Sequence, residues 1–225
     1  NYFPGRGKLP REATLDLLRS VYAESSEDEL LEMMNYIKKR KNEEMMGGTM
    51  NHGKRKNKNL ARQAATYLRK SDGPRVAVFE VNGFDTHAAQ GGVDGTHTKC
   101  LVEMDEIFNN LKDNLQEAYK DTIILTVTEF GRTVKQNGGN GTEHGYGTAI
   151  FMAGGLIKKS QVHTDWPGLK KKELYQGRDL NATIDARSVY ASAMSTVFDL
   201  DFKRIQKDVF WGEDLQNLSD KLFKA

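Results

Sequence analysis

The sequence lacks several features that would by themselves point to a class of protein. Cys100 is the only cysteine among the 225 residues, which excludes a disulfide within the chain and a zinc site made of cysteine thiolates. No apolar run approaches the roughly 20 residues of a membrane-spanning helix. The 33 basic and 31 acidic residues almost cancel, so the net charge of +2 gives no general reason to expect a nucleic acid or an acidic membrane as a partner.

What remains is the composition of a folded protein. Hydrophobic residues make up 38% and charged residues 28% of the chain, which is typical of globular proteins. The length fits one α/β domain with a helical appendage. The chain opens at Asn1, without an initiator Met or a signal-peptide pattern, so we expect a processed product or a piece of a longer protein. Low cysteine usage fits the bacterial cytoplasm and the periplasm alike.

Residues 1–59 are expected to form a helical segment followed by an exposed loop. Apolar residues recur at helical spacing over 11–23 and 26–40. Residues 41–59 are polar and contain a Gly-Gly pair, which favours a loop. The loop carries a basic cluster, Lys54, Arg55, Lys56 and Lys58. Nucleic-acid binding through this cluster is the weaker interpretation, because a solvated loop explains the same run.

Residues 60–225 are expected to form an α/β domain. Helical and strand-like patterns alternate along it, namely a helix over 60–70, a strand over 75–81, a helix over 98–119, strands over 122–128 and 148–153, and a helix over 186–198. A strand, a helix and a second strand predict a right-handed crossover between parallel strands. The apolar run over 122–128 is typical of a strand buried on both faces. The pattern therefore predicts a helix-flanked, mostly parallel sheet.

The first candidate site follows the predicted strand 75–81. Asp85 and His87 lie just past its end, where open α/β sheets bind ligands. One carboxylate oxygen and one imidazole nitrogen from a single turn suit zinc, manganese or a similar divalent ion. The alternative is that Asp85 caps the turn and His87 is a surface residue.

The second candidate site follows the predicted strand 122–128. Glu129 and Arg132 place a carboxylate and a guanidinium at the same edge of the sheet. The planar fork of Arg132 matches the geometry of phosphate, sulfate or carboxylate groups. The alternative is that Arg132 forms a salt bridge with Glu129 or Asp85.

The third candidate site is the glycine-rich loop over 136–147, which brings Glu143 and His144 to the start of the strand predicted over 148–153. Glycine lets a backbone approach a ligand closely. The loop has no phosphate-loop lysine and no strand-to-helix context, so it is not a nucleotide cradle. His52, His97 and His163 are taken as background histidines, although His97 could approach the site from the loop after His87.

Taken in order, these motifs resemble a known family. The sequence contains GFDTH, then TEFGRT after an apolar strand, then EHGYG, AGG and DAR. In order and spacing over roughly 60–195 they resemble the uncharacterised bacterial family called domain of unknown function 1501. That family is similar to the alkaline phosphatase and sulfatase superfamily, whose fold is a helix-flanked sheet with one or two divalent metals at the strand ends.

The resemblance implies roles for individual residues. Asp85 and His87 resemble the Asp and His ligands of one metal, and His144 resembles the later histidine ligand. Glu129 and Phe130 fall where sulfatase-like relatives have an Asp-His pair for a second metal, so Phe130 removes one expected ligand of that metal. Glu129 is expected to act as a ligand or general base, and Arg132 to orient the anion. The expected cofactor is zinc, manganese, calcium or magnesium.

The resemblance also leaves one element unaccounted for. The superfamily's first strand carries an Asp ligand and a Ser or Thr nucleophile, and residues 1–59 do not resemble it. We therefore expect either the C-terminal portion of a longer protein or a form that has lost this strand. The first functional hypothesis is a metal-dependent hydrolase of phosphate or sulfate esters, and the second, which a lost strand would favour, is a binding or assembly protein that keeps the fold. A missing strand would leave an open sheet edge, so we expect a second polypeptide or a homo-oligomer there. Family analogy places the protein in the periplasm or outside the cell.

Overall fold

The computed structural model describes residues 55–224. The helices predicted over 11–23 and 26–40, and the loop up to residue 54, lie outside this part. The elements in chain order are α3 (Arg55–Leu68), α4 (Thr96–Leu115), η1 (Gln116–Asp121), β1 (Ile124–Leu125), β2 (Gly131–Arg132), β3 (His144–Gly145), β4 (Met152–Ala153), η2 (Lys171–Glu173), α5 (Ala186–Phe198), α6 (Phe202–Asp208) and α7 (Ser219–Leu222). No helix in this part is long and apolar enough to cross a membrane.

Helix α3 starts earlier than the sequence predicts. It begins at Arg55, so the loop prediction is wrong for the last five residues of 41–59. Two polar side chains in this first turn contact α4: Asn57 donates a hydrogen bond to Glu103 at 2.7 Å, and Lys58 lies 3.1 Å from Glu106. These contacts explain how a polar sequence continues the helix.

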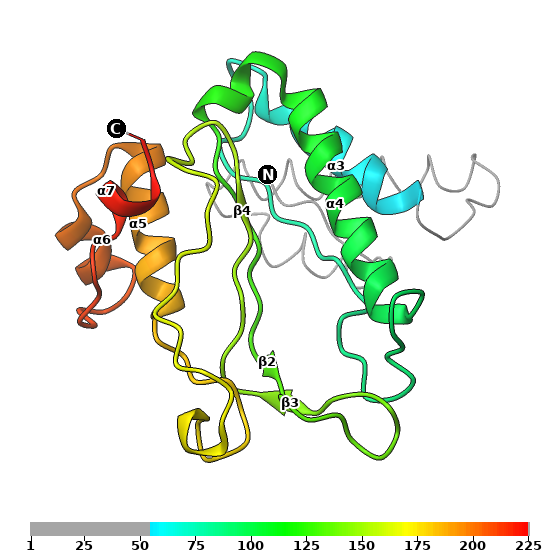
Figure 1. Cartoon of the computed structure of the whole chain (residues 1–225). Coiled ribbons are helices and arrows are strands. Elements are labelled where there is room, and N and C mark those ends of the chain that lie inside the picture. Colours follow the sequence, from blue (N-terminus) through cyan, green and yellow to red (C-terminus); the bar gives the residue numbers. More distant parts are fainter. Residues whose placement is uncertain (1–54, 225) are drawn as a thin grey trace, which may run out of the picture.

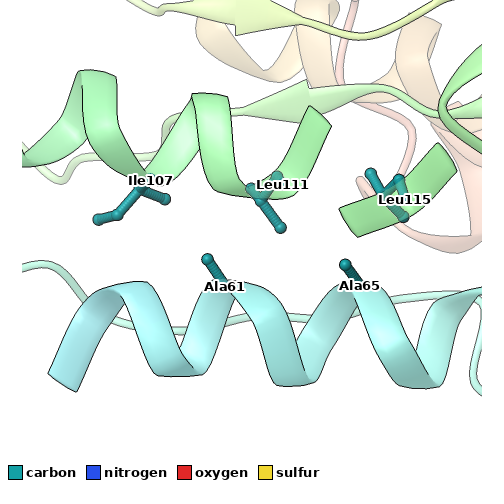
Figure 2. Packing of buried hydrophobic residues seen from close by; sticks show 5 residues of the cluster. All are labelled: Ala61, Ala65, Ile107, Leu111 and Leu115. Carbon is teal, nitrogen blue, oxygen red and sulfur yellow. The ribbon is translucent and has the colours of Figure 1, made fainter. Parts of the chain in front are cut away.

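Helices α3 and α4 pack through small residues against large ones (Figure 2). Ala61 and Ala65 of α3 face Ile107, Leu111 and Leu115 of α4, and all five are buried. Residues four apart form one ridge of a helix, so each helix contributes one row. The alanines let the two helix axes come close, and the α4 side chains fill the space between them.

The extended segments run between two groups of helices (Figure 1). Ile124 packs against the α3 and α4 cluster, whereas Ile123 and Leu125 pack against a second cluster that includes Val189 of α5 and Leu222 of α7. Successive side chains of a strand point to opposite faces. The segment around β1 therefore has helices on both sides.

The strand pairs among residues 55–224 are short and antiparallel. Strand β1 pairs with β4, and β2 pairs with β3. The predicted strand over 148–153 thus shortens to β4 and runs opposite to β1. This part of the chain contains no parallel pair, so the mostly parallel sheet and the alkaline phosphatase-like fold stay predictions.

The segment 75–81, predicted to be a strand, has no ladder partner among residues 55–224. No backbone hydrogen bond joins it to another part of the described chain. Phe79 and Val81 pack against the α3 and α4 cluster, while Val76 and Val78 are exposed, Val78 by 87%. Only its last residues alternate, with Phe79 and Val81 packed and Glu80 exposed between them, while residues 75–78 are all exposed. No cross-strand neighbour for this segment is present among residues 55–224.

Candidate metal centre

Backbone pairing brings the three predicted motif loops together. Backbone hydrogen bonds join residues 86–90 to residues 139–142. The N–H of Ala89 donates to the carbonyl of Gly139 and the N–H of Gln90 to that of Asn140, both at 2.8 Å. Arg132 and His144 are cross-strand partners in the β2 and β3 pair. Asp85 and His87, Arg132, and His144 thus come from separate segments and meet at one place.

Asp85, His87 and His144 point their ligand atoms at one another. Asp85 Oδ1 lies 3.0 Å from His87 Nε2 and 3.0 Å from His144 Nε2, and the two Nε2 atoms are 3.1 Å apart. All three side chains are about half exposed, at 55%, 45% and 48%. The sequence prediction that these residues share one site agrees with this geometry, and one side of the group is open to solvent.

The triangle fits a divalent ion in size and chemistry. Zinc bonds of about 2.0 to 2.2 Å in tetrahedral geometry place neighbouring ligand atoms roughly 3.3 to 3.6 Å apart, so a small outward shift of the three atoms admits the ion. Two imidazole nitrogens and one carboxylate oxygen are a donor set that zinc and similar metals accept. Without a cation, an Nε2–H of one ring can donate to the other ring or to Asp85 Oδ1, whereas with a cation both Nε2 lone pairs and the Asp85 oxygen would converge on it.

Arg132 holds the Asp85 carboxylate. Its Nη1 donates to Asp85 Oδ1, its Nε donates to Thr142 Oγ1 at 2.9 Å, and its Nη2 donates to the Thr142 carbonyl. The salt bridge to Asp85 was one of the two predicted alternatives for Arg132, and the structure has it. Desolvation raises the pKa of Asp85, but hydrogen bonds from Arg132 and His144 and the nearby histidines outweigh it, so the pKa lies below its ordinary value. The carboxylate is therefore ionised at neutral pH, as a metal ligand must be.

His87 is held from its other ring nitrogen. Its Nδ1 lies 3.0 Å from Glu143 Oε2, and Asn137 Nδ2 donates both to Glu143 Oε1 and, at 2.8 Å, to the His87 carbonyl. The hydrogen bonds from Asn137 and His87 hold the pKa of Glu143 below its ordinary value. The sequence predicts no role for Glu143 or Asn137, because nothing in the local sequence pairs them with His87, which lies 56 and 50 positions away.

His144 is held by stacking. The Phe130 ring lies 3.7 Å from the His144 ring, centroid to centroid, at an interplanar angle of 17°. Arg178 Nη2 donates to the His144 carbonyl at 3.4 Å. Phe130 was noted in the sequence only as a missing ligand of a second metal. The structure shows instead that it covers one face of a predicted ligand.

Small and buried polar residues support the loops behind the centre. Thr86 and Thr142 are both buried, and their hydroxyls donate to Gln90 Oε1 at 2.8 and 3.0 Å. A Cβ at Gly141 would collide with the His87 backbone, and one at Gly145 with the Arg132 backbone. Glycine is therefore required where the glycine-rich loop crosses the other two segments.

The predicted candidate Glu129 and the background histidine His97 do not join the group. Glu129 lies exposed in a bend before β2 and makes no hydrogen bond or ion pair with any residue of 55–224 that the structure describes. The bend directs the chain into the β2 and β3 pair at Gly131, so Arg132 rather than Glu129 reaches the group. His97 packs its ring edge-on against Phe84, with centroids 5.8 Å apart. The centre therefore consists of Asp85, His87 and His144 with their supporting residues.

Comparison with known proteins yields one match. A family model described as protein of unknown function (DUF1501) matches residues 6–207. No curated protein and no solved structure matches the chain. The matched span includes all three loops of the centre and most of the helices around them.

Proposed function

This chain belongs to the DUF1501 family, and on the geometry of its centre we propose that it is a divalent-metal-dependent hydrolase of phosphate or sulfate esters. One observation carries the proposal: ligand atoms of Asp85, His87 and His144 lie within 4.8 Å of one another. Zinc is the metal that this donor set suits best. The three protein ligands leave a position open on the exposed side, which is the arrangement of catalytic rather than structural zinc sites.

Each surrounding residue has a role in this proposal. Arg132 fixes the Asp85 carboxylate, Phe130 fixes the ring plane of His144, and the open side admits a small anionic ester. A divalent metal bound there would act as a Lewis acid on the ester oxygen and lower the pKa of a water molecule to near neutrality. Glu129 does not contact the group, so a general base at Glu129 has no support from this geometry.

The proposal extends to a similarity with the alkaline phosphatase and sulfatase superfamily. Two features support it: the order of the Asp-His, Glu-Phe and His motifs along the chain, and the helices on both sides of the segment around β1. With that similarity goes a periplasmic or secreted location. Residues 55–224 supply ligands for a metal that would activate water, and the proposal assigns no covalent nucleophile to this part of the chain.

The test is a metal-dependence assay on matched variants. Chelator-treated protein is reloaded with zinc, manganese, calcium or magnesium and assayed on 4-nitrophenyl phosphate and 4-nitrophenyl sulfate. We expect hydrolysis of one ester with zinc, no hydrolysis after chelation, and loss of activity in His144→Ala, while the matched control His163→Ala retains it. Zinc binding without hydrolysis of either ester would contradict the enzymatic part of the proposal.

A second function, binding or assembly, is favoured by a different observation. Val76 and Val78 are exposed on a segment whose backbone has no partner among residues 55–224. An unpaired apolar strand edge attracts a strand of another polypeptide or of a second copy. If this is its function, light scattering will show self-association that Val78→Lys abolishes. A wild-type protein that stays monomeric and co-purifies with no second polypeptide would argue against it.

A further inference from the structure

The two histidines of the centre are oriented by different means. The Nδ1 atom of His87, which faces away from the other two ligands, lies 3.0 Å from the carboxylate oxygen Oε2 of Glu143. His144 has no such partner on its second nitrogen among residues 55–224, and the Phe130 ring covers its face instead. This difference calls for an explanation, because both histidines direct Nε2 at the same point.

We infer that Glu143 is the positioning residue of the proposed metal centre, where its carboxylate accepts the Nδ1–H of His87 and thereby directs the Nε2 lone pair to the metal. This inference rests on the proposed function. A neutral imidazole carries a single N–H, so an acceptor at Nδ1 keeps the proton there and leaves Nε2 free to bind a cation. The same hydrogen bond fixes the orientation of the ring, so that Nε2 stays directed at the other two ligand atoms.

Asn137 holds Glu143 in place for this role. Its side-chain nitrogen donates to Glu143 Oε1 and to the His87 carbonyl, so it ties the carboxylate and the histidine backbone together. Its side-chain oxygen accepts from the N–H groups of Gly139 and Gly141 at 2.9 and 3.0 Å. The side-chain amide of Asn137 therefore joins the glycine-rich loop to both partners of the contact, Glu143 and His87.

The competing explanation is an ordinary surface ion pair. The side chains of His87 and Glu143 are 45% and 53% exposed, and exposed pairs of this kind contribute little to stability. A surface pair would leave the tautomer of His87 mixed and the metal affinity unchanged when Glu143 is replaced. The positioning role predicts that both change, since loss of such an outer partner typically weakens metal binding 10-fold to 100-fold.

The experiment compares Glu143→Ala and Glu143→Gln with wild type and with Glu213→Gln. Glu213 is the matched control, because it is an exposed carboxylate in an ion pair with Arg187, 3.3 Å away, in the segment that follows α6. Zinc affinity is measured by competition with a chelator. The tautomer of His87 is read from the nitrogen chemical shifts of the imidazole in the metal-free protein. Melting temperature reports whether each variant is folded.

We expect the Nδ1–H tautomer of His87 in wild type and in Glu143→Gln, which keeps an acceptor oxygen, and a mixed tautomer in Glu143→Ala. Zinc affinity should fall 10-fold to 100-fold in Glu143→Ala, less in Glu143→Gln, and not in Glu213→Gln. A wild-type His87 protonated at Nε2, or a Glu143→Ala variant with wild-type zinc affinity, would overturn the inference. Absence of zinc binding in wild type would overturn the proposed metal site instead, and the tautomer would still decide whether Glu143 controls His87.

Discussion

Replacing Arg132 with alanine is expected to loosen the centre and weaken its metal affinity, without acting on anion binding directly. The guanidinium bonds Asp85 from one loop and Thr142 from another, so it joins the two sides of the centre. Lysine keeps the charge but presents a single ammonium in place of the planar fork. Arg132→Lys should therefore keep one of these bonds and lose the others.

The size of the effect follows from burial. Thr142 is 9% exposed and the Arg132 side chain 20%. Hydrogen bonds that involve a charged group contribute about 1.5 to 3 kcal/mol, and a buried carbonyl left without a partner costs about 1 to 3 kcal/mol. Because the freed groups can recruit water, we expect Arg132→Ala to lower the free energy of unfolding by about 2 to 3 kcal/mol and Arg132→Lys by about half of that. Solvent screens the contact with Asp85, which adds little.

Urea unfolding of the two variants and wild type measures this loss, and calorimetric titrations give the zinc and phosphate affinities of the folded proteins. Zinc affinity should fall 10-fold to 100-fold in Arg132→Ala, because Asp85 loses its orienting partner. Phosphate affinity of the metal-free protein should not change. If Arg132→Ala unfolds at the wild-type urea concentration and binds phosphate ten times more weakly, Arg132 is an anion-binding residue and the positioning role is wrong.

Three further predictions concern the surroundings of the centre. Leu115→Ala should lower the free energy of unfolding in urea by about 2 to 5 kcal/mol, because Leu115 is 1% exposed between α3 and α4. Val102→Ala, at an exposed position of α4, should lower it by under about 0.5 kcal/mol, and equal losses would contradict the packing. Phe130→Ala should weaken zinc binding by freeing the His144 ring, and Phe130→Tyr should restore it; unchanged affinity in both would remove the stacking role. Hydrogen bonds from Arg187 lower the pKa of Asp185, the N-cap of α5, in the folded protein. The ionised carboxylate therefore stabilises the fold above the unfolded-state pKa of about 4, and this stabilisation is lost as the pH falls through the lower pKa of the folded state. Asp185→Asn should remove this part of the acid dependence, measured as urea midpoints between about pH 2 and 7, and an unaltered acid profile would contradict it.

The helices could be predicted from the sequence where local patterns decide them. The helix predicted over 186–198 is confirmed as α5. The helix predicted over 98–119 is confirmed in kind, but α4 ends at Leu115, where Gln116 takes a positive φ of 52° and the chain continues as a 3₁₀ turn. Apolar spacing continues through that point, so it gives no sign of the break.

The strands could not be predicted to the same extent, because a strand exists only through a partner. Residues 75–81 have the β-branched and aromatic composition of a strand, yet no ladder forms among residues 55–224. Residues 131–132 and 144–145 form one although neither has a strand-like sequence. Their pairing depends on the close approach at Gly145, which is a contact between distant parts of the chain.

The candidate ligands could be predicted because each lies in a loop at the end of a strand-like segment. Motif placement singled out Asp85, His87 and His144, and the family resemblance implied that they share one metal. The supporting residues needed the cross-loop register: Glu143 lies 56 positions from His87, and the stacking of Phe130 on His144 depends on the β2 and β3 pair. The same register explains why Arg132 enters the group and Glu129 does not.

Metal content is the most direct test of the centre. The purified chain is stripped with a chelator, reloaded with zinc, dialysed, and analysed for metal per chain by mass spectrometry, alongside His87→Ala, His144→Ala and the control His163→Ala. We predict about one tightly held zinc ion per chain in wild type and in the control, and none in the two centre variants. Wild-type protein that retains no metal, or centre variants that retain as much as wild type, would contradict the assignment of Asp85, His87 and His144 as a metal centre.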